Sequence, residues 1–132
     1  MRSTPYTPPD ARIFGIGLSK TGTHTLTHAL NTLGVPCVHY PDPALMLAGD
    51  YDRALGEHLA ATDISVSAFY RELDARYPGS LFILTTREPS SWLDSVADHR
   101  RRRAHEDTTD CPKAAIREIV YGMRGFERAA FA

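Results

Sequence analysis

Residues 13–25 of this 132-residue chain read IFGIGLSKTGTHT, a short apolar run that enters a glycine-rich turn. The apolar run, residues 13–16, is typical of a buried strand. After the turn, apolar residues recur at three- and four-residue spacing, which predicts a helix over 23–33 that Gly34 and Pro36 end. A glycine-rich turn between a strand and a helix presents backbone N–H groups and the positive end of the helix dipole to an anion.

Strands and helices continue to alternate after this opening unit. Residues 35–40 predict a second short strand, and Asp42-Pro43 begins a less regular helical region that runs through Ala61. A helix that ends at Pro78-Gly79 leads into the fully apolar strand 81–85, which suits the middle of a parallel sheet. The alternation predicts an α/β domain with a mainly parallel sheet of about three strands.

The C-terminal third predicts two more helices. Pro89 opens the first, in which Trp92 lies on the apolar face and is expected to be a core anchor. The run Arg100–Arg103 at its end is interpreted as a solvated surface next to the negative helix terminus. A loop at 107–110 then precedes a helix over 113–131.

Composition narrows the class of protein. Hydrophobic residues make up 42% of the chain and charged residues 23%, as in soluble globular domains. The formal net charge of -1 favours neither nucleic acid nor an anionic membrane, and no apolar run is long enough to span a bilayer. Two cysteines, Cys37 and Cys111, are too few for a disulfide framework, so we expect a reducing, cytoplasmic location.

Two common phosphate-binding loops do not fit this stretch. A dinucleotide-binding fingerprint that starts at Gly15 and Gly17 needs its third glycine two residues before Gly22. A nucleoside triphosphatase loop fits Gly17 and Gly22, but Thr23-His24 stands where its lysine and magnesium-binding hydroxyl belong. The apolar strand is followed by Arg87 rather than by an aspartate that could hold magnesium.

What remains is a phosphate-binding loop whose lysine, Lys20, precedes the second glycine. This loop resembles that of the sulfotransferase family, in its branch of small bacterial members, where it holds the 5'-phosphosulfate of 3'-phosphoadenosine 5'-phosphosulfate (PAPS). Arg87, with Ser95 eight residues later, resembles the family's Arg and Ser pair on the 3'-phosphate. An arginine can clamp a phosphate with two parallel hydrogen bonds, and a serine can add a hydroxyl donor. The resemblance extends over residues 13–96.

The resemblance implies a P-loop-type three-layer α/β domain. This domain occupies residues 12–132, corresponds to the N-terminal portion of the family's fold, and follows a flexible proline-rich arm at 1–11. Family members continue past this length with a segment that closes over the adenosine and the 3'-phosphate. We therefore expect an incomplete fold whose uncovered sheet surfaces allow homo-oligomers, and weak or no activity from these residues alone.

The resemblance also implies roles for individual residues. Lys20 is expected to be catalytic, because its ammonium group can stabilise charge on the leaving phosphate oxygen. No metal is implied. His24 stands where the family usually has Thr or Ser. The residues expected to bind the donor are Ser19, Lys20, Thr21, Gly22, Thr23, His24, Thr25, Arg87 and Ser95.

The acceptor has to lose a proton, so a base is needed close to the sulfur. His39 ends the second predicted strand, and Asp63 precedes the helix that ends at Pro78-Gly79. Both can lie at the carboxyl edge of the sheet, where open α/β folds bind ligands. We rank Asp63 slightly above His39, while helix capping or loop polarity explains either residue equally well.

The sequence thus favours a sulfotransferase that moves a sulfuryl group from PAPS to a hydroxyl or amine of a small-molecule or glycan acceptor. Two alternatives stay open: a truncated, inactive nucleotide-binding or interaction module of the same fold, and a P-loop kinase-like phosphoryl transferase. Nucleic acid and membrane are not expected partners.

Overall fold

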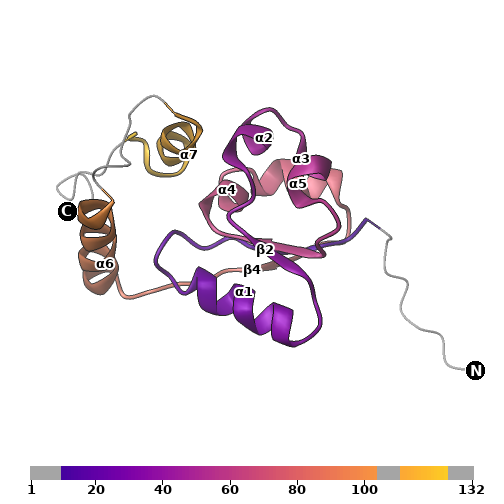
Figure 1. Cartoon of the computed structure of the whole chain (residues 1–132), viewed down its shortest axis with the longest axis horizontal. Helices are drawn as coiled ribbons and strands as arrows, with labels where there is room; N and C mark the ends of the chain where they lie inside the picture. Colours follow the sequence, from indigo (N-terminus) through magenta and orange to yellow (C-terminus); the bar gives the residue numbers. More distant parts are fainter. Residues whose placement is uncertain (1–9, 104–110, 125–132) are drawn as a thin grey trace, which may run out of the picture.

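The computed structural model describes residues 10–103 and 111–124 (Figure 1). Most of the predicted arm, the loop at 107–110 and the end of the last predicted helix lie outside the described residues. In chain order the elements are β1 (Ile13–Gly15), α1 (Thr23–Thr32), β2 (Cys37–His39), α2 (Pro43–Leu47), α3 (Tyr51–Leu55), β3 (Ala60–Thr62), α4 (Ile64–Ser67), α5 (Tyr70–Arg76), β4 (Leu81–Ile83), α6 (Pro89–Arg102) and α7 (Pro112–Tyr121).

The described strands form one parallel sheet in the order β2-β3-β1-β4. Ile13 of β1 is paired with Ala60 of β3 on one side and with Leu81 of β4 on the other. The prediction of an α/β domain with a mainly parallel sheet is confirmed. All four carboxyl ends meet at the same edge, so the segments after the four strands are neighbours in space.

The helical region predicted through Ala61 is wrong for Ala60 and Ala61. Two short helices, α2 and α3, are followed there by strand β3. Ala60, Ala61 and Thr62 are all buried, with at most 1% of any of them exposed. Alanine has little intrinsic preference for strands, so pairing with β1 and β2, distant in sequence, decides this element. The sheet accordingly has four described strands rather than about three.

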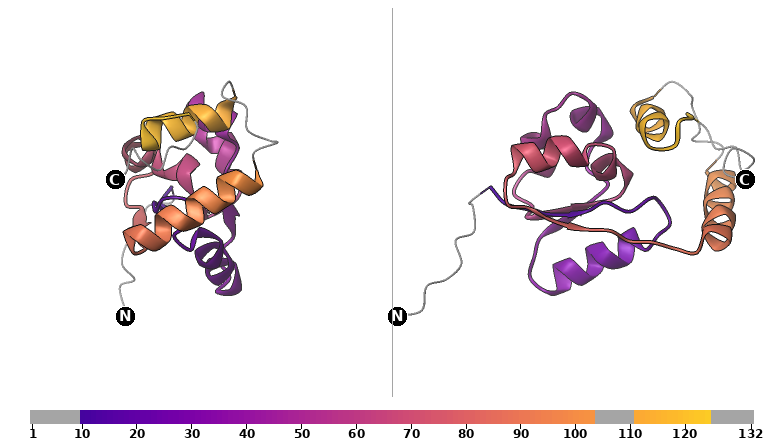
Figure 2. Two further views of the ribbon diagram at one scale, coloured as in Figure 1. Left: turned by 90° about the vertical axis from the view of Figure 1, so that its left-hand side faces the viewer. Right: turned by 180° about the vertical axis from the view of Figure 1, so that it is seen from behind.

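Helices cover the sheet on both faces (Figures 1 and 2). Helix α1 packs on one face, mainly against β2 and β3, and α2 to α5 pack on the other. The main core lies on the second face and is built around Phe14, whose ring lies 5.9 Å from that of Tyr77. A smaller cluster under α1 joins Leu30, Cys37 and Ala60. These layers match the three-layer expectation.

Strand β4 is an edge strand of the described sheet, not a middle strand as its apolar sequence predicted. Phe82 faces the main core, while Leu81 and Ile83 alternate to the other face. Because α1 packs mainly on β2 and β3, it leaves this end of the sheet open. Leu81 is 65% exposed as a result, and Leu84, which follows the strand, is also 65% exposed.

Helices α6 and α7 lie beyond the carboxyl edge of the sheet (Figure 2). Helix α7 packs against α2 and α4. Trp92 of α6 is only 7% exposed and its ring lies 6.0 Å from that of Tyr121, so the structure agrees with its expected role as a core anchor. None of the described helices is long and apolar enough to cross a membrane.

Candidate functional site

The glycine-rich loop between β1 and α1 folds closely onto the segment after β4. A Cβ atom at Gly17 would lie 1.8 Å from the Thr85 hydroxyl oxygen, so only glycine fits there. The hydroxyl groups of Thr21 and Thr85 share a hydrogen bond of 2.7 Å, and Thr21 Oγ1 also donates to the carbonyl of Leu18. Thr21, expected to bind the donor, therefore holds the loop's own shape.

Helix α1 begins at the end of this loop with a glycine. Gly22 is its N-cap, with a φ angle of 89° that favours glycine, and no side chain of that residue caps the first amide groups. Thr23 is buried, while His24 and Thr25 are exposed in the first turn. These residues fit the predicted phosphate cradle, because the N-terminus of a ten-residue helix faces the loop that carries Lys20.

Three elements hold the backbone of the loop. Trp92 Nε1 of α6 donates to the carbonyl of Ser19 at 2.8 Å, and the N–H of Ser19 donates to the Tyr121 hydroxyl of α7 at 3.2 Å. Ser67 Oγ of α4 donates to the carbonyl of Gly17 at 2.7 Å. Hydrogen bonds to backbone atoms fix the path of the chain, so the cradle is held from several sides. Neither Tyr121 nor Ser67 was predicted from the sequence as a residue of the site.

Arg87 follows β4 and contacts the loop directly. Its Nη1 donates to the carbonyl of Lys20 at 3.2 Å, and its Nε donates to Ser91 Oγ at 3.0 Å. Ser95, the partner expected from the sequence, is half-buried one helical turn beyond Ser91. The structure thus brings Arg87 to Lys20 and Ser91, and it does not join Arg87 to Ser95.

A pocket of about 290 Å³ opens beside the loop, between the sheet edge and helices α6 and α7. Five of the predicted site residues line it: Ser19, Lys20, His24, His39 and Asp63. Further lining residues were not predicted as site residues: Tyr40, His99, Arg100, Arg103, Lys113, Arg117 and Tyr121. The two candidate bases and the loop lysine therefore share one pocket.

The solvated-surface interpretation of Arg100–Arg103 holds for the three exposed arginines, of which Arg101 and Arg102 pair with Asp98. Arg100 is half-buried, and Arg100 and Arg103 both line the pocket, which this interpretation did not include. The signal was present in the sequence, because residues 96, 100 and 103 continue one helical stripe. What the sequence did not show is that this stripe faces a pocket.

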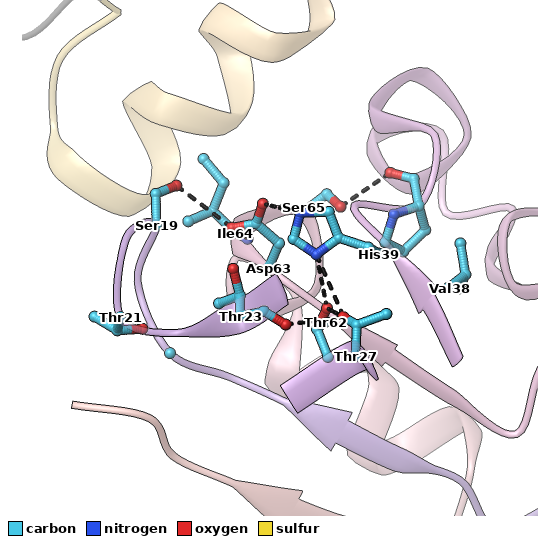
Figure 3. Close-up of polar contacts among 12 residues, drawn as sticks. Ser19, Thr21, Thr23, Thr27, Val38, His39, Thr62, Asp63, Ile64 and Ser65 are labelled. Carbon is cyan, nitrogen blue, oxygen red and sulfur yellow. Dashed lines mark hydrogen bonds and ion pairs between the residues drawn. The ribbon is translucent and has the colours of Figure 1, made fainter. Parts of the chain in front are cut away.

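Asp63 and His39 contact each other at the end of strands β3 and β2 (Figure 3). His39 Nε2 lies 3.3 Å from Asp63 Oδ2, and His39 Nδ1 lies 3.1 Å from Thr62 Oγ1. The other carboxylate oxygen of Asp63 accepts from the N–H of Ile64 at 2.8 Å, so Asp63 also caps α4. Its side chain keeps 13% of its surface exposed.

Burial lowers the pKa of His39, the Asp63 carboxylate opposes that shift, and the nearby His24 adds to it. The rings of His24 and His39 have centroids 3.7 Å apart. A neutral His39 is therefore favoured near pH 7, and its contacts are satisfied when Nε2–H donates to Asp63 and Nδ1 accepts from Thr62. In this arrangement both ring nitrogens of His39 are engaged by the protein.

Backbone strain gathers at the same pocket. Among the described residues, the non-glycine residues with positive φ are Lys20 at 64°, Tyr40 at 55° and Asp63 at 85°. Each such residue costs about 1–3 kcal/mol and persists only where surrounding contacts hold it. All three line the pocket, which is the distribution expected of a functional site.

Residues 12–128 match the family model described as the sulfotransferase domain. The chain belongs to this family, and the resemblance found in the loop and at Arg87 is confirmed at that level. The chain is also similar to Ava biosynthesis cluster protein M of Aspergillus versicolor, with 34% identity in an alignment 107 residues long that covers 64% of this chain. The match covers 41% of that relative, so the chain spans less than half of its length.

Proposed function

We propose that the chain carries the donor cradle and the acceptor pocket of a sulfotransferase that transfers a sulfuryl group from PAPS to a hydroxyl or amine. The supporting observation is that Lys20, on the loop, and Asp63, at the end of β3, open on one pocket. A transfer site needs donor and acceptor groups held side by side in this way.

The residues present fit the donor. Gly17 lets the loop lie close to the segment after β4, and Gly22 leaves the first turn of α1 open to an anion. No carboxylate of the described residues lies within ion-pair distance of the Lys20 ammonium group. Arg87, held against the loop, would bind the 3'-phosphate, with Ser95 or Ser91 as a hydroxyl partner.

Asp63 is the better candidate for the base. Both residues line the pocket. Both ring nitrogens of His39 already have protein partners. A carboxylate has about four lone-pair sites, so Asp63 can accept another proton donor besides Ile64, Ser19 and His39. Asp63 would take the proton from the acceptor as the acceptor oxygen or nitrogen bonds to sulfur. The bond from sulfur to the bridging phosphate oxygen breaks, and Lys20 neutralises the charge left on that oxygen. His39 would orient the carboxylate through its Nε2–H.

Binding of 3',5'-adenosine bisphosphate, the product left after transfer, tests this proposal. We expect calorimetry to give the same dissociation constant with magnesium and with EDTA. Arg87→Ala should weaken binding at least tenfold, while Arg71→Ala, an exposed position on α5, should not change it. Absence of binding, or a strict need for magnesium as in the kinase-like alternative, would refute the proposal.

Turnover separates the enzyme from an inactive module of the same fold. If PAPS with a panel of phenols and amines yields no sulfated product although 3',5'-adenosine bisphosphate binds, the inactive-module alternative holds for these 132 residues.

A further inference from the structure

The chemistry-bearing residues lie along the carboxyl edge in the order of the strands. The sheet order β2-β3-β1-β4 puts Tyr40, which follows β2, at one end of this edge, and Arg87, which follows β4, at the other. Asp63 follows β3 and the Lys20 loop follows β1, so both lie between them. A donor held by the loop and by Arg87 occupies the β4 side. The space on the β2 side of Asp63 is left for the acceptor.

That β2 side is lined by cations from the last described helix. Lys113 Nζ lies 6.0 Å from the ring centroid of Tyr40, and both residues line the pocket. Arg117 follows one turn later on α7, and it is only 7% exposed. Among the described residues that line the pocket, Asp63 is the one carboxylate, against Lys20, Arg100, Arg103, Lys113 and Arg117.

The electrostatic environment of His99 is consistent with a positive pocket. Burial lowers the pKa of His99 first, and the charges of Lys20 and Arg103 then lower it further, with smaller effects from Arg100 and Arg102. A group in this position is harder to protonate because the neighbouring charges are positive. The same charges attract an anion, and they do so more strongly in a partly enclosed pocket than in open water.

We propose that the acceptor is a small molecule that carries an anionic group, a carboxylate or a phosphate or sulfate ester, besides the hydroxyl or amine that is sulfated. This inference rests on the proposed function. Lys113 and Arg117 bind the anionic group at the β2 side of the pocket, and the reacting group then faces Asp63. The pocket volume of about 290 Å³ suits a single small-molecule acceptor rather than an extended polymer.

A matched pair of phenols tests the charge alone. 4-Hydroxyphenylacetate and 4-hydroxyphenylacetamide have the same shape and the same phenol, and only the first is an anion. We expect the carboxylate to bind the complex with 3',5'-adenosine bisphosphate at least tenfold more tightly by calorimetry. It should also have the higher kcat/KM with PAPS. Equal binding of the two probes, tighter binding of the amide, or no binding of the carboxylate at millimolar concentration overturns the proposal.

Variants of Lys113 test where the anion binds. Lys113→Gln should remove most of the preference for the carboxylate through KM, with kcat and the affinity for 3',5'-adenosine bisphosphate changed less than twofold. Lys113→Arg should restore the preference, and Arg53→Gln, at an exposed position on α3, is the surface control. If Lys113→Gln weakens the binding of 3',5'-adenosine bisphosphate as much as it weakens the binding of the acceptor, Lys113 belongs to the donor site and the proposal fails. Loss of bisphosphate binding in the parent protein would instead refute the proposed function.

Discussion

The indole Nε1 of Trp92 donates a 2.8 Å hydrogen bond to the carbonyl of Ser19, one residue before the loop lysine. Trp92 is buried on α6. Its hydrogen bond therefore connects the loop to a helix that begins 67 residues after Gly22, where the loop ends. Tyr121 contacts the same residue from α7. The proposed phosphate cradle therefore depends on α6 and α7 for its backbone position.

Trp92→Phe removes this hydrogen bond and keeps most of the ring packing. We expect a loss of about 1 kcal/mol in the free energy of unfolding, measured by urea denaturation. The affinity for 3',5'-adenosine bisphosphate should fall as well, because the carbonyl of Ser19 is no longer held. Unchanged stability and unchanged affinity together would contradict this role of Trp92.

Lys20→Ala tests the catalytic charge. Turnover should fall by roughly 100-fold or more, because a charge partner of the transition state is lost. The melting temperature should change little, because both residues have to adopt the positive φ of 64° and alanine also has a Cβ. Turnover within a factor of three of the parent value in a folded Lys20→Ala variant would rule out the assignment.

Gly17→Ala tests the close approach of the loop to the segment after β4. The added Cβ would meet Thr85 Oγ1 at 1.8 Å and the Thr85 carbonyl oxygen at 2.7 Å, so backbone has to move. Gly34→Ala is the matched control, because nothing lies within 4 Å and only its φ of 82° is strained. We expect about 1 kcal/mol of destabilisation for the control and at least twice that for Gly17→Ala. Equal losses would show that the contact is easily relieved.

The stability should depend on pH through two histidines. The pKa values of His39 and His99 lie below the usual 6.5 in the folded protein, mainly because of burial. The unfolded chain therefore binds more protons as the pH falls below 6.5, and the free energy of unfolding decreases down to the folded-state pKa values. Urea denaturation at about pH 7.5 and about pH 5.5 measures this. The pair of changes His39→Gln and His99→Gln should flatten the dependence, and an unchanged slope would assign it to other groups.

The exposed apolar surface at β4 predicts self-association of the chain. Leu81 and Leu84 are each 65% exposed beside an unpaired strand edge of the described sheet. Sedimentation velocity should show oligomers or aggregates of the parent protein and fewer of them for Leu84→Glu. Tyr70→Glu, at an exposed position on α5, controls for added charge alone. A monomeric parent protein at all concentrations would refute this expectation.

The parts of the fold that could be predicted from the sequence are those with a local sequence pattern. Residues 13–33 carry strand, loop and helix patterns in the order observed, because glycine spacing and helical periodicity are local properties. Strand β3 was missed because Ala60 and Ala61 become a strand only through pairing with β1 and β2.

For the site, too, local motifs could be predicted from the sequence, and contacts between distant segments could not. The motif resemblance made Lys20 and Arg87 candidate donor-binding residues, and the position of Asp63 after a strand made it a candidate base. The contact between Asp63 and His39 was not readable, because it depends on β2 and β3 being neighbours. Nor could the sequence show that Lys113 and Arg117 reach the pocket, since that depends on how α7 packs against α2 and α4.

The positive φ angles of Lys20, Tyr40 and Asp63 bear on any attempt to make this protein more robust. Glycine at each of these three positions relieves the strain. No described partner of the Lys20 side chain is lost with it, so a screen for thermal resistance alone should enrich Lys20→Gly. Asp63→Gly, in contrast, also removes the cap of α4 and the contact with His39. Each replacement also removes a pocket side chain: the loop ammonium, the ring beside Lys113, or the candidate base. The protein thus carries the side chains of its candidate site on strained backbone positions. We expect selection for thermal stability alone to remove such side chains and to lower activity.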